Sequence, residues 1–394
     1  MSVGILFDSF SDNVGDIAML AANRSLLAHH GVDDVVPVDL FATSEQSYSS
    51  VLIGGGELIR PTGSLFYDRF RQEEATVLAA VGVWQDADDL DYLRGYDFVS
   101  ARTRVEADVL ARSGASAAVL PCPTMALPTD DRSVDLPGDE ALIGIHVVPS
   151  SLRDVPSLIT RLNGIPGRKV MIPFTRYLHD ASFLSALPIG DRDNVWLSTA
   201  LTPVQLRGAV ARMSFIVASS LHLTLFALSA GIPFISYGQP KVRAYLEDRG
   251  LGDLLFTDDD SLERAIANAG SMGEEIARIG REDATRVVDE YSAIARILKD
   301  RLAERVVLAP MSADPEQTRW ELRLEQVSHV LSGRDMLINS LIHASAERDV
   351  LRLLLEGERA GNARLIEELE RPLSTRELLA AAKKTMRGRT RRRP

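Results

Sequence analysis

Short apolar runs alternate with longer amphipathic stretches along most of this chain, and this alternation constrains the fold more than any other feature of the sequence. The first run, VGILFD at 3–8, is bounded by polar residues, as expected for a strand buried on both faces of a sheet. Strand–helix alternation predicts a parallel sheet with helices on both faces. Further strands are expected at 35–40, 50–55, 96–101 and 117–122, and helices at about 16–30 and 66–83.

A polar segment near Asp130 separates two similar units. The stretch TDDRSVDLPGDE contains Pro137 and Gly138 and is typical of a linker. We therefore predict an α/β fold of two Rossmann-like lobes with parallel sheets, an N-terminal lobe at 1–130 and a C-terminal lobe at 141–305, joined by a linker at 131–140. Strands of the second lobe are expected at 141–148, 169–174, 194–199, 215–220, 233–237 and 254–258, and helical residues from 260 to 305 are expected to close it.

The chain changes in character from about Pro315 onward. Trp320, Leu324 and Val327 begin a series of apolar residues at spacings of three, four and seven, which predicts an amphipathic helical extension over 315–382. A short coiled coil, and with it a homo-oligomer, is one interpretation of this spacing.

Charge is distributed unevenly along the chain. The formal net charge is −11, yet residues 383–394, KKTMRGRTRRRP, form a basic tail with seven cations and no anion. The acidic body argues against nucleic acid as a specific partner. The basic tail fits two hypotheses, a peripheral contact with an anionic membrane surface and a disordered terminus that binds polyanions indiscriminately.

Cysteine content and the N-terminus indicate the compartment. Cys122 is the only cysteine, so no disulfide forms within the chain and a reducing cytoplasm is expected. The N-terminal MSVGILFD lacks the basic and long apolar regions of a signal peptide. No apolar run approaches the roughly 20 residues that span a bilayer. We expect a cytoplasmic protein, held at the inner face of the membrane if the first hypothesis for the tail is correct.

Polar residues directly after the strands are the candidates for a functional site, because open parallel sheets bind ligands beyond the carboxyl ends of their strands. One strand ends on three glycines, which either make a tight turn or let the backbone approach a ligand. The candidates are Asn13, Gly15, Asp16, Gly54, Gly55, Gly56, Arg102, Ser219, Ser220, His222, Tyr237 and Lys241.

Several of these residues carry chemistry that packing alone does not require. Arg102 offers a planar fork to a carboxylate or a phosphate. His222 stands at the start of a helix, where the helix N-terminus lowers the pKa of an imidazole. With Tyr237 and Lys241 it forms a polar cluster suited to a phosphorylated substrate. The turn after the first strand fits both a capped helix start and an anion site with Asp16 as a base.

Sequence fingerprints of nucleotide and metal sites are missing. The segment GGGELIRP at 54–61 has neither the G-x-G-x-x-G spacing nor a G-K-[ST] sequence. The chain contains no H-E-x-x-H and no pair of acids spaced for a metal, so no metal site is expected.

N-x-G-D after the first strand, GGG after a later one, S-x-R before a helix and the segment VASSLHLTLFALSAGIPFISYGQPKVRAYLEDRGL together resemble the polysaccharide pyruvyl transferase family. The resemblance covers roughly residues 1–260. It implies a two-lobed architecture similar to glycosyltransferases of the GT-B type. It also implies transfer of the pyruvyl group of phosphoenolpyruvate to two hydroxyls of a cell-surface polysaccharide or its lipid-linked precursor, which forms a ketal without a metal or other cofactor.

The resemblance also implies roles for individual residues. His222 matches the histidine of the family's S-R-L-H segment and is expected to act as general acid toward phosphoenolpyruvate. Arg102 matches the S-x-R arginine and is expected to bind phosphate or carboxylate. Lys241 matches a lysine after the P-x-I-x-Y strand, and Asp16 matches the acid of N-x-G-D.

Two positions depart from the family pattern. Ser220 replaces the arginine of S-R-L-H, and Cys122 replaces an aspartate before proline. A donor with three negative charges thereby loses charge-assisted hydrogen bonds worth about 1.5–3 kcal/mol each. Three outcomes are open: Arg176 or Arg243 supplies the missing charge, the donor differs, or transferase activity is lost.

Two other functions are compatible with the sequence. One is a GT-B-type glycosyltransferase that uses a nucleotide sugar. The other is a catalytically degenerate lobe pair that binds a glycan or a partner protein.

Overall fold

The computed structural model describes residues 2–8, 13–38, 48–64, 67–72, 75–130, 134–138, 140–175, 180–190 and 194–304. The predicted helical extension at 315–382, the basic tail at 383–394, and Arg176 lie outside the described residues.

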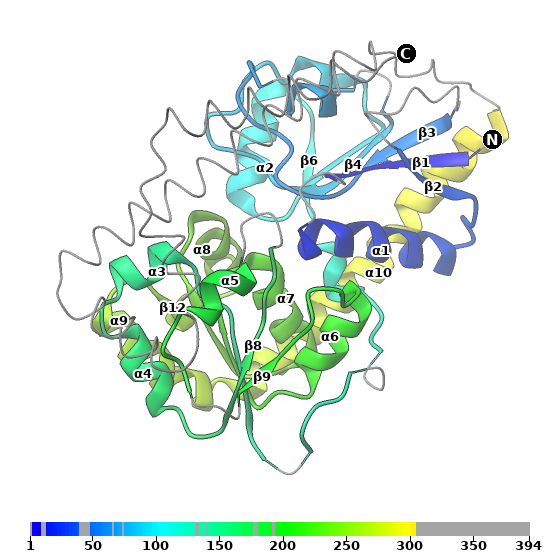
Figure 1. Cartoon of the computed structure of the whole chain (residues 1–394). Coiled ribbons are helices and arrows are strands. Elements are labelled where there is room, and N and C mark those ends of the chain that lie inside the picture. The colour runs from blue at the N-terminus through cyan, green and yellow to red at the C-terminus, as the bar shows by residue number, and fades with distance from the viewer. Residues whose placement is uncertain are drawn as a thin grey trace, which may run out of the picture.

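Two six-stranded sheets form two lobes, one above the other in Figure 1. The strand order is β2-β1-β3-β4-β5-β6 in the first sheet and β12-β11-β10-β7-β8-β9 in the second. Every strand pairing within the two sheets is parallel. The predicted α/β fold with two Rossmann-like lobes is confirmed.

The first lobe places α1 and α2 after strands of its sheet. Its strands are β1 (Ser2–Leu6), β2 (Val35–Val38), β3 (Tyr48–Ile53), β4 (Val77–Val81), β5 (Phe98–Ala101) and β6 (Ala117–Val119), and its α-helices are α1 (Val14–His29) and α2 (Arg104–Leu110). Its 3-10 turns are η1 (Tyr67–Phe70), η2 (Asp91–Gly95), η3 (Ala111–Ser113) and η4 (Pro123–Ala126).

The second lobe repeats the alternation of strands and helices. Its strands are β7 (Leu142–Ile145), β8 (Arg168–Met171), β9 (Val195–Trp196), β10 (Phe215–Ala218), β11 (Phe234–Tyr237) and β12 (Leu255–Phe256). Its helices are α3 (Pro149–Asp154), α4 (Leu158–Gly164), α5 (Asp180–Ser185), α6 (Pro203–Ala211), α7 (Leu221–Ala230), α8 (Pro240–Glu247), η5 (Gly252–Leu254) and α9 (Asp259–Ser271). The chain then continues into the long helix α10 (Gly273–Glu304).

The helix predicted at 66–83 is wrong. The segment contains the short turn η1 and then strand β4, all five residues of which are buried between β3 and β5. A short apolar run that is buried on every side has no periodicity to separate a strand from a helix.

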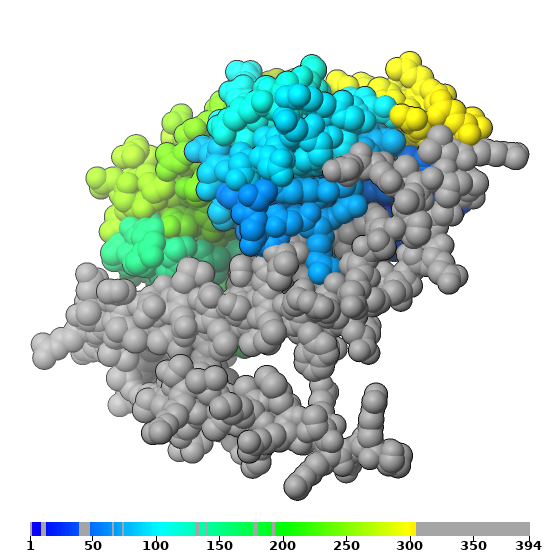
Figure 2. Space-filling view, turned by 90° about the horizontal axis from the view of Figure 1, so that it is seen from above, coloured from blue at the N-terminus to red at the C-terminus, as the bar shows by residue number. Residues whose placement is uncertain are grey.

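Residues 260–304 are helical in α9 and α10, and α10 contacts both lobes. It packs against α7 of the second lobe and against α1, β1 and β3 of the first. The Tyr291 hydroxyl donates to Asn23 on α1, and the amide of Asn23 donates to the Gly54 carbonyl at 3.0 Å. Arg301 pairs with Asp97 at 2.8 Å. Figure 2 shows the yellow end of α10 beside the blue and cyan first lobe.

Apolar packing continues across the junction between the lobes. One hydrophobic cluster includes Ile5 of β1, Met125 of η4 and Val217 of β10. Burial of such side chains contributes about 25 cal/mol per Å² of apolar surface, so the lobes are joined by more than a linker. No helix within the described ranges is both long and apolar enough to cross a bilayer.

Candidate functional site

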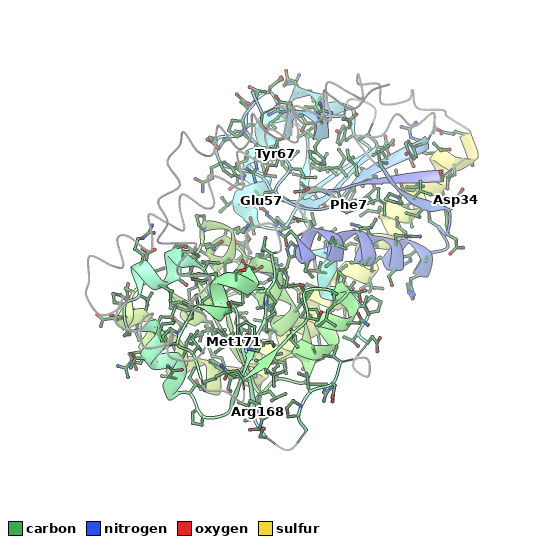
Figure 3. All side chains as sticks on the ribbon, viewed as in Figure 1. Phe7, Asp34, Glu57, Tyr67, Arg168 and Met171 are labelled. Carbon is green, nitrogen blue, oxygen red and sulfur yellow. The ribbon has the colours of Figure 1, made fainter. Side chains whose placement is uncertain are left out.

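The carboxyl ends of the two sheets meet at the junction of the lobes. Figure 3 shows Glu57, which follows β3, at the edge of the first lobe that faces the second lobe. Its carboxylate pairs with Lys241 of α8 at 3.1 Å, and this ion pair joins the lobes. Residues that follow strands of both lobes therefore come together. Open parallel sheets bind ligands at this position, beyond the carboxyl ends of their strands.

His222 lies at the centre of this junction. It is the second residue of α7, which begins a few residues after β10. Its ring lies against the backbone of Gly15 at the start of α1, so closely that a Cβ atom on Gly15 would overlap the imidazole. The side chain is only 7% exposed, and within the described part of the chain Nε2 has no hydrogen-bond partner. An unpaired buried nitrogen is costly and is often found where a ligand binds.

The surroundings of His222 favour its neutral form. Burial, together with the positive charges of Arg102 and Lys241, lowers the pKa of His222 from its usual 6.5 to about 3, although Glu57 opposes this shift. Both cations therefore lie close enough to act on the imidazole. A bound anion would reverse their effect and favour the imidazolium.

Arg102 is nearly buried at the end of β5. Its side chain is 3% exposed and pairs with Glu106 of α2 at 2.5 Å. Burial disfavours its charge, but Glu106 and Glu57 outweigh that cost and raise the pKa of Arg102 above its usual value. Gly82, after β4, leaves room for the guanidinium, because a Cβ atom there would overlap it.

The charge of Lys241 is also neutralised, by the carboxylate of Glu57. Burial raises the pKa of Glu57, but the charges of Lys241 and Arg102 outweigh this effect and lower it overall. The side chains of Lys241 and Glu57 are 33% and 25% exposed, so solvent reaches both. Arg243, the other described candidate for the missing family arginine, also lies on α8. It is half exposed and lies 3.9 Å from Glu247 of the same helix.

Asp16 lies in the first turn of α1, where it is buried. Its Oδ1 is 3.3 Å from the point that a Cβ atom of Gly56 would occupy, and Gly56 has a φ of +79°. Asn13 caps the same helix, because its Oδ1 accepts the Gly15 N–H at 2.9 Å. Asn13 is therefore the N-cap of α1, and the imidazole of His222 lies against the backbone of Gly15.

Two of the three glycines after β3 face the protein interior. Gly54 is held by Asn23 of α1, and Gly55 lies against Phe7 and Met19. Only Gly56 lies beside acidic side chains of the junction, those of Asp8 and Asp16.

The two serines before His222 have different environments. Ser219 is buried, its N–H donates to Nδ1 of His146 at 3.4 Å, and its hydroxyl has no hydrogen-bond partner within the described ranges. Ser220 precedes α7 as its N-cap, but its side chain makes no capping bond. His146 in turn contacts Asp180 at 3.1 Å, a buried pair that the sequence analysis did not identify.

Tyr237 is engaged elsewhere. Its hydroxyl donates to Asp154 on α3, and burial together with Asp154 raises the pKa of the phenol. The structure therefore brings together His222, Arg102, Lys241 and the Gly15–Asp16 turn, and it gives Tyr237 a partner within the second lobe.

Sequence analysis missed several polar residues of the junction. Glu57 and Arg60 belong to the segment GGGELIRP, where only the glycines attracted attention. Tyr67 follows in η1. Burial and the nearby acidic side chains raise the pKa of its phenol to about 12, although the charge of Arg60 opposes this shift. Within the described part of the chain, no group of three histidine, cysteine or carboxylate side chains is placed to hold a metal ion.

Comparisons with known proteins identify one family. The sequence profile described as polysaccharide pyruvyl transferase matches residues 13–239, more than half of the chain. A comparison with curated proteins gives no match.

Solved structures with a similar fold have low sequence identity to this chain. One is a candidate UDP-N-acetylglucosamine 2-epimerase from Listeria monocytogenes, with a TM-score of 0.49, 10% identity and coverage of 78% of this chain and 97% of that chain. A UDP-GlcNAc 2-epimerase from Neisseria meningitidis bound to UDP-GlcNAc has a TM-score of 0.44, 11% identity and coverage of 77% and 100%. The E. coli heptosyltransferase WaaC with ADP has a TM-score of 0.36, 12% identity and coverage of 68% and 100%.

Proposed function

The chain belongs to the polysaccharide pyruvyl transferase family, and we propose that it transfers the pyruvyl group of phosphoenolpyruvate to two hydroxyls of a sugar in a cell-surface polysaccharide or its lipid-linked precursor. The observation that carries this proposal is the imidazole of His222, whose Nε2 is buried and unpaired within the described ranges while two cations act on it from both lobes.

The first chemical step needs an acid. Protonation of C3 of the enolpyruvyl group produces the methyl group and an oxocarbenium-like centre at C2, and a sugar hydroxyl then attacks C2. Burial, Arg102 and Lys241 lower the pKa of His222 to about 3, so the imidazole is neutral before the donor binds. The negative charges of a bound donor would raise this pKa, so that His222 takes up the proton it later gives to C3.

The second step needs a base and a stabilised leaving group. The second sugar hydroxyl closes the ketal at C2 as the C2–O bond to phosphate breaks. Of the two hydroxyl protons, one replaces the proton given by the acid and the other leaves with inorganic phosphate. Asp16 is proposed as the base, because it lies next to Gly15, on which the imidazole rests. Arg102 and Lys241 are proposed to stabilise the departing phosphate.

We propose that the donor enters through local opening around the ion pair of Lys241 and Glu57, while α10 and the apolar cluster keep the lobes joined. His222 and Arg102 are 7% and 3% exposed, and the ion pair of Lys241 and Glu57 spans the junction. We propose that the donor's anionic groups take the place of Glu57 beside Lys241 when the site opens. Closure around the donor then excludes water from the oxocarbenium-like centre.

Replacing His222 tests this function. In H222Q the glutamine keeps a polar side chain of similar reach but has no titratable group, so ketal formation should fall by at least about 100-fold. The assay detects inorganic phosphate together with the methyl signal of the pyruvate ketal, with phosphoenolpyruvate and lipid-linked or soluble glycans. Unchanged turnover in H222Q would exclude the assigned acid.

The purified protein can also be used to distinguish pyruvyl transfer from the two other functions, a glycosyltransferase and a degenerate binding protein. A thermal-shift comparison of phosphoenolpyruvate with nucleotide sugars measures which ligand stabilises the protein. Stabilisation by a nucleotide sugar alone would favour the glycosyltransferase, and stabilisation by neither, with glycan binding retained, would favour the degenerate binding protein. The glycan acceptor, the peripheral membrane contact through 383–394 and the homo-oligomer remain predictions from the sequence.

A further inference from the structure

Arg60 lies in the loop that follows the three glycines after β3. Its Nε donates to the Glu57 carbonyl at 2.9 Å, and its own carbonyl accepts from Arg71 at 2.5 Å. The segment runs parallel to the residues after β4, where Ile59 pairs with Val83. The backbone and one edge of the guanidinium are therefore fixed at the carboxyl end of the first sheet.

Two aromatic rings fix the plane of this guanidinium. The Arg60 Cζ lies 3.7 Å from the centre of the Tyr67 ring and 4.4 Å from the centre of the Trp84 ring. A cation held against such rings is stabilised by their electron-rich faces. The planar fork is thus oriented before any ligand arrives, which reduces the entropy lost when it binds one.

The terminal nitrogens of Arg60 have no competing partner in the described part of the chain. Neither Nη1 nor Nη2 makes a hydrogen bond or an ion pair there. The other two junction cations differ, because Arg102 contacts Glu106 at 2.5 Å and Lys241 contacts Glu57 at 3.1 Å. Of these three cations, Arg60 is the one without a carboxylate partner among the described residues.

Glu57 contacts both Arg60 and a cation of the proposed donor site. Its carbonyl holds Arg60, its carboxylate holds Lys241, and its charge acts on His222. Arg60 also acts on the carboxylate of Glu57 through its charge. Arg60 and Lys241 therefore both contact Glu57, Arg60 at its carbonyl and Lys241 at its carboxylate.

We propose that Arg60 binds one oxyanion group of the donor and supplies the guanidinium fork that Ser220 lacks. The inference rests on the proposed function for the identity of the donor, phosphoenolpyruvate. Its carboxylate and its phosphate both match a guanidinium fork. Of the earlier candidates for this role, Arg243 is half exposed beside Glu247, whereas Arg60 is oriented and open.

Trp84 makes this inference directly measurable. The chain has three tryptophans, so the double variant W196F/W320F leaves Trp84, which stacks on Arg60, as the only indole. Titration of this protein with phosphoenolpyruvate, or with inorganic phosphate, should change its emission in a saturable way. In the same background R60M should weaken phosphoenolpyruvate binding by about 10- to 100-fold. R60K keeps the charge but not the fork, so its affinity should lie between the two.

R94M is the matched control. Arg94 is 63% exposed, lies before the amino end of β5 and pairs with Asp91, so its loss removes the same charge away from the junction. Its phosphoenolpyruvate affinity should stay within about twofold of the parent. The thermal midpoint of each variant shows that it is folded, and calorimetric titration in the native tryptophan background checks the fluorescence result.

The outcomes separate this inference from the proposed function. Equal phosphoenolpyruvate affinity in the parent and in R60M would overturn the inference even if ketal formation were observed. Arg60-dependent binding of phosphoenolpyruvate without ketal formation would support the inference and contradict the proposed transfer. Failure of the parent to bind either anion would overturn the inference, and the product assay would then judge the transfer independently.

Discussion

At the scale of single residues, the contact between Gly15 and His222 determines whether the imidazole can reach its position. Gly15 begins α1 after the Asn13 cap, and the ring of His222 fills the space where its Cβ would be. A glycine at a helix start is usually explained by conformational freedom. Here the close approach of the two lobes explains it instead.

We predict that G15A displaces the imidazole without preventing folding. Alanine favours the helical backbone, but its methyl group would overlap the ring, so ketal formation should fall by at least about tenfold while the helical content stays unchanged. Steady-state turnover and circular dichroism measure the two effects. G270A is the control, because Gly270 lies in α9 with open space around it. Equal turnover in G15A and the parent would contradict the contact.

The buried imidazole also predicts how stability depends on pH. Burial and two neighbouring cations lower the pKa of His222 from 6.5 to about 3, so between these values the unfolded chain binds a proton that the folded chain does not. The stability that the neutral ring contributes is therefore complete above about pH 6.5 and is lost as the pH falls toward 3. At pH 5 the loss is about 2 kcal/mol.

Urea unfolding of the parent and of H222Q at pH 7 and pH 5 measures this loss. Carboxylates titrate in both proteins, so they cancel in the difference between them. The free energy of unfolding should fall less in H222Q than in the parent. An equal fall in both proteins would show that the imidazole is not held neutral.

The sequence identified the reactive residues of the site but not the partners that set their charge. His222, Arg102 and Lys241 follow strands, and their position along the chain marks them. Glu57 and Glu106 neutralise two of these cations, and only the contact of Arg102 with Glu106, four residues away, is local in sequence. Lys241 and Glu57 are far apart in sequence, so no motif that spans a few residues reveals their pairing.

At the scale of elements, α10 fixes the two lobes to each other. Its amphipathic pattern predicts a helix, but the pattern cannot say which lobe receives its apolar face. The structure shows contacts with both, through α7 of the second lobe and through α1, β1 and β3 of the first. For strand β4 the sequence does not even decide the type of element. All of its residues are buried, so their pattern matches a helix or a strand equally well until the neighbouring strands are known.

We predict that removing one hydroxyl of α10 weakens the whole junction. Tyr291 is buried and donates to Asn23, so Y291F leaves the Asn23 carbonyl oxygen without that donor and should lower the free energy of unfolding by about 1–3 kcal/mol. Y92F is the control, since the buried Tyr92 hydroxyl has no hydrogen-bond partner within the described ranges and its loss should cost little. Denaturant unfolding measures both, and equal values would contradict a linking role for Tyr291.

At the scale of the whole molecule, the two lobes hold an almost closed site whose cations are mostly neutralised. Arg102 and Lys241 face carboxylates, and Asp8 and Asp16 lie nearby. A trianionic donor therefore enters a site with little net positive charge unless a proton enters with it. The unpaired Nε2 of His222 is the nitrogen on which that proton would reside.

Calorimetric titration of the protein with phosphoenolpyruvate near pH 7, in two buffers that differ in ionisation enthalpy, tests this account most directly. The account predicts that the parent takes up close to one proton, about the amount needed to convert the neutral imidazole to its charged form, and that H222Q takes up none. Tight binding without proton uptake, or equal uptake in H222Q, would contradict the assignment of His222 as the acid.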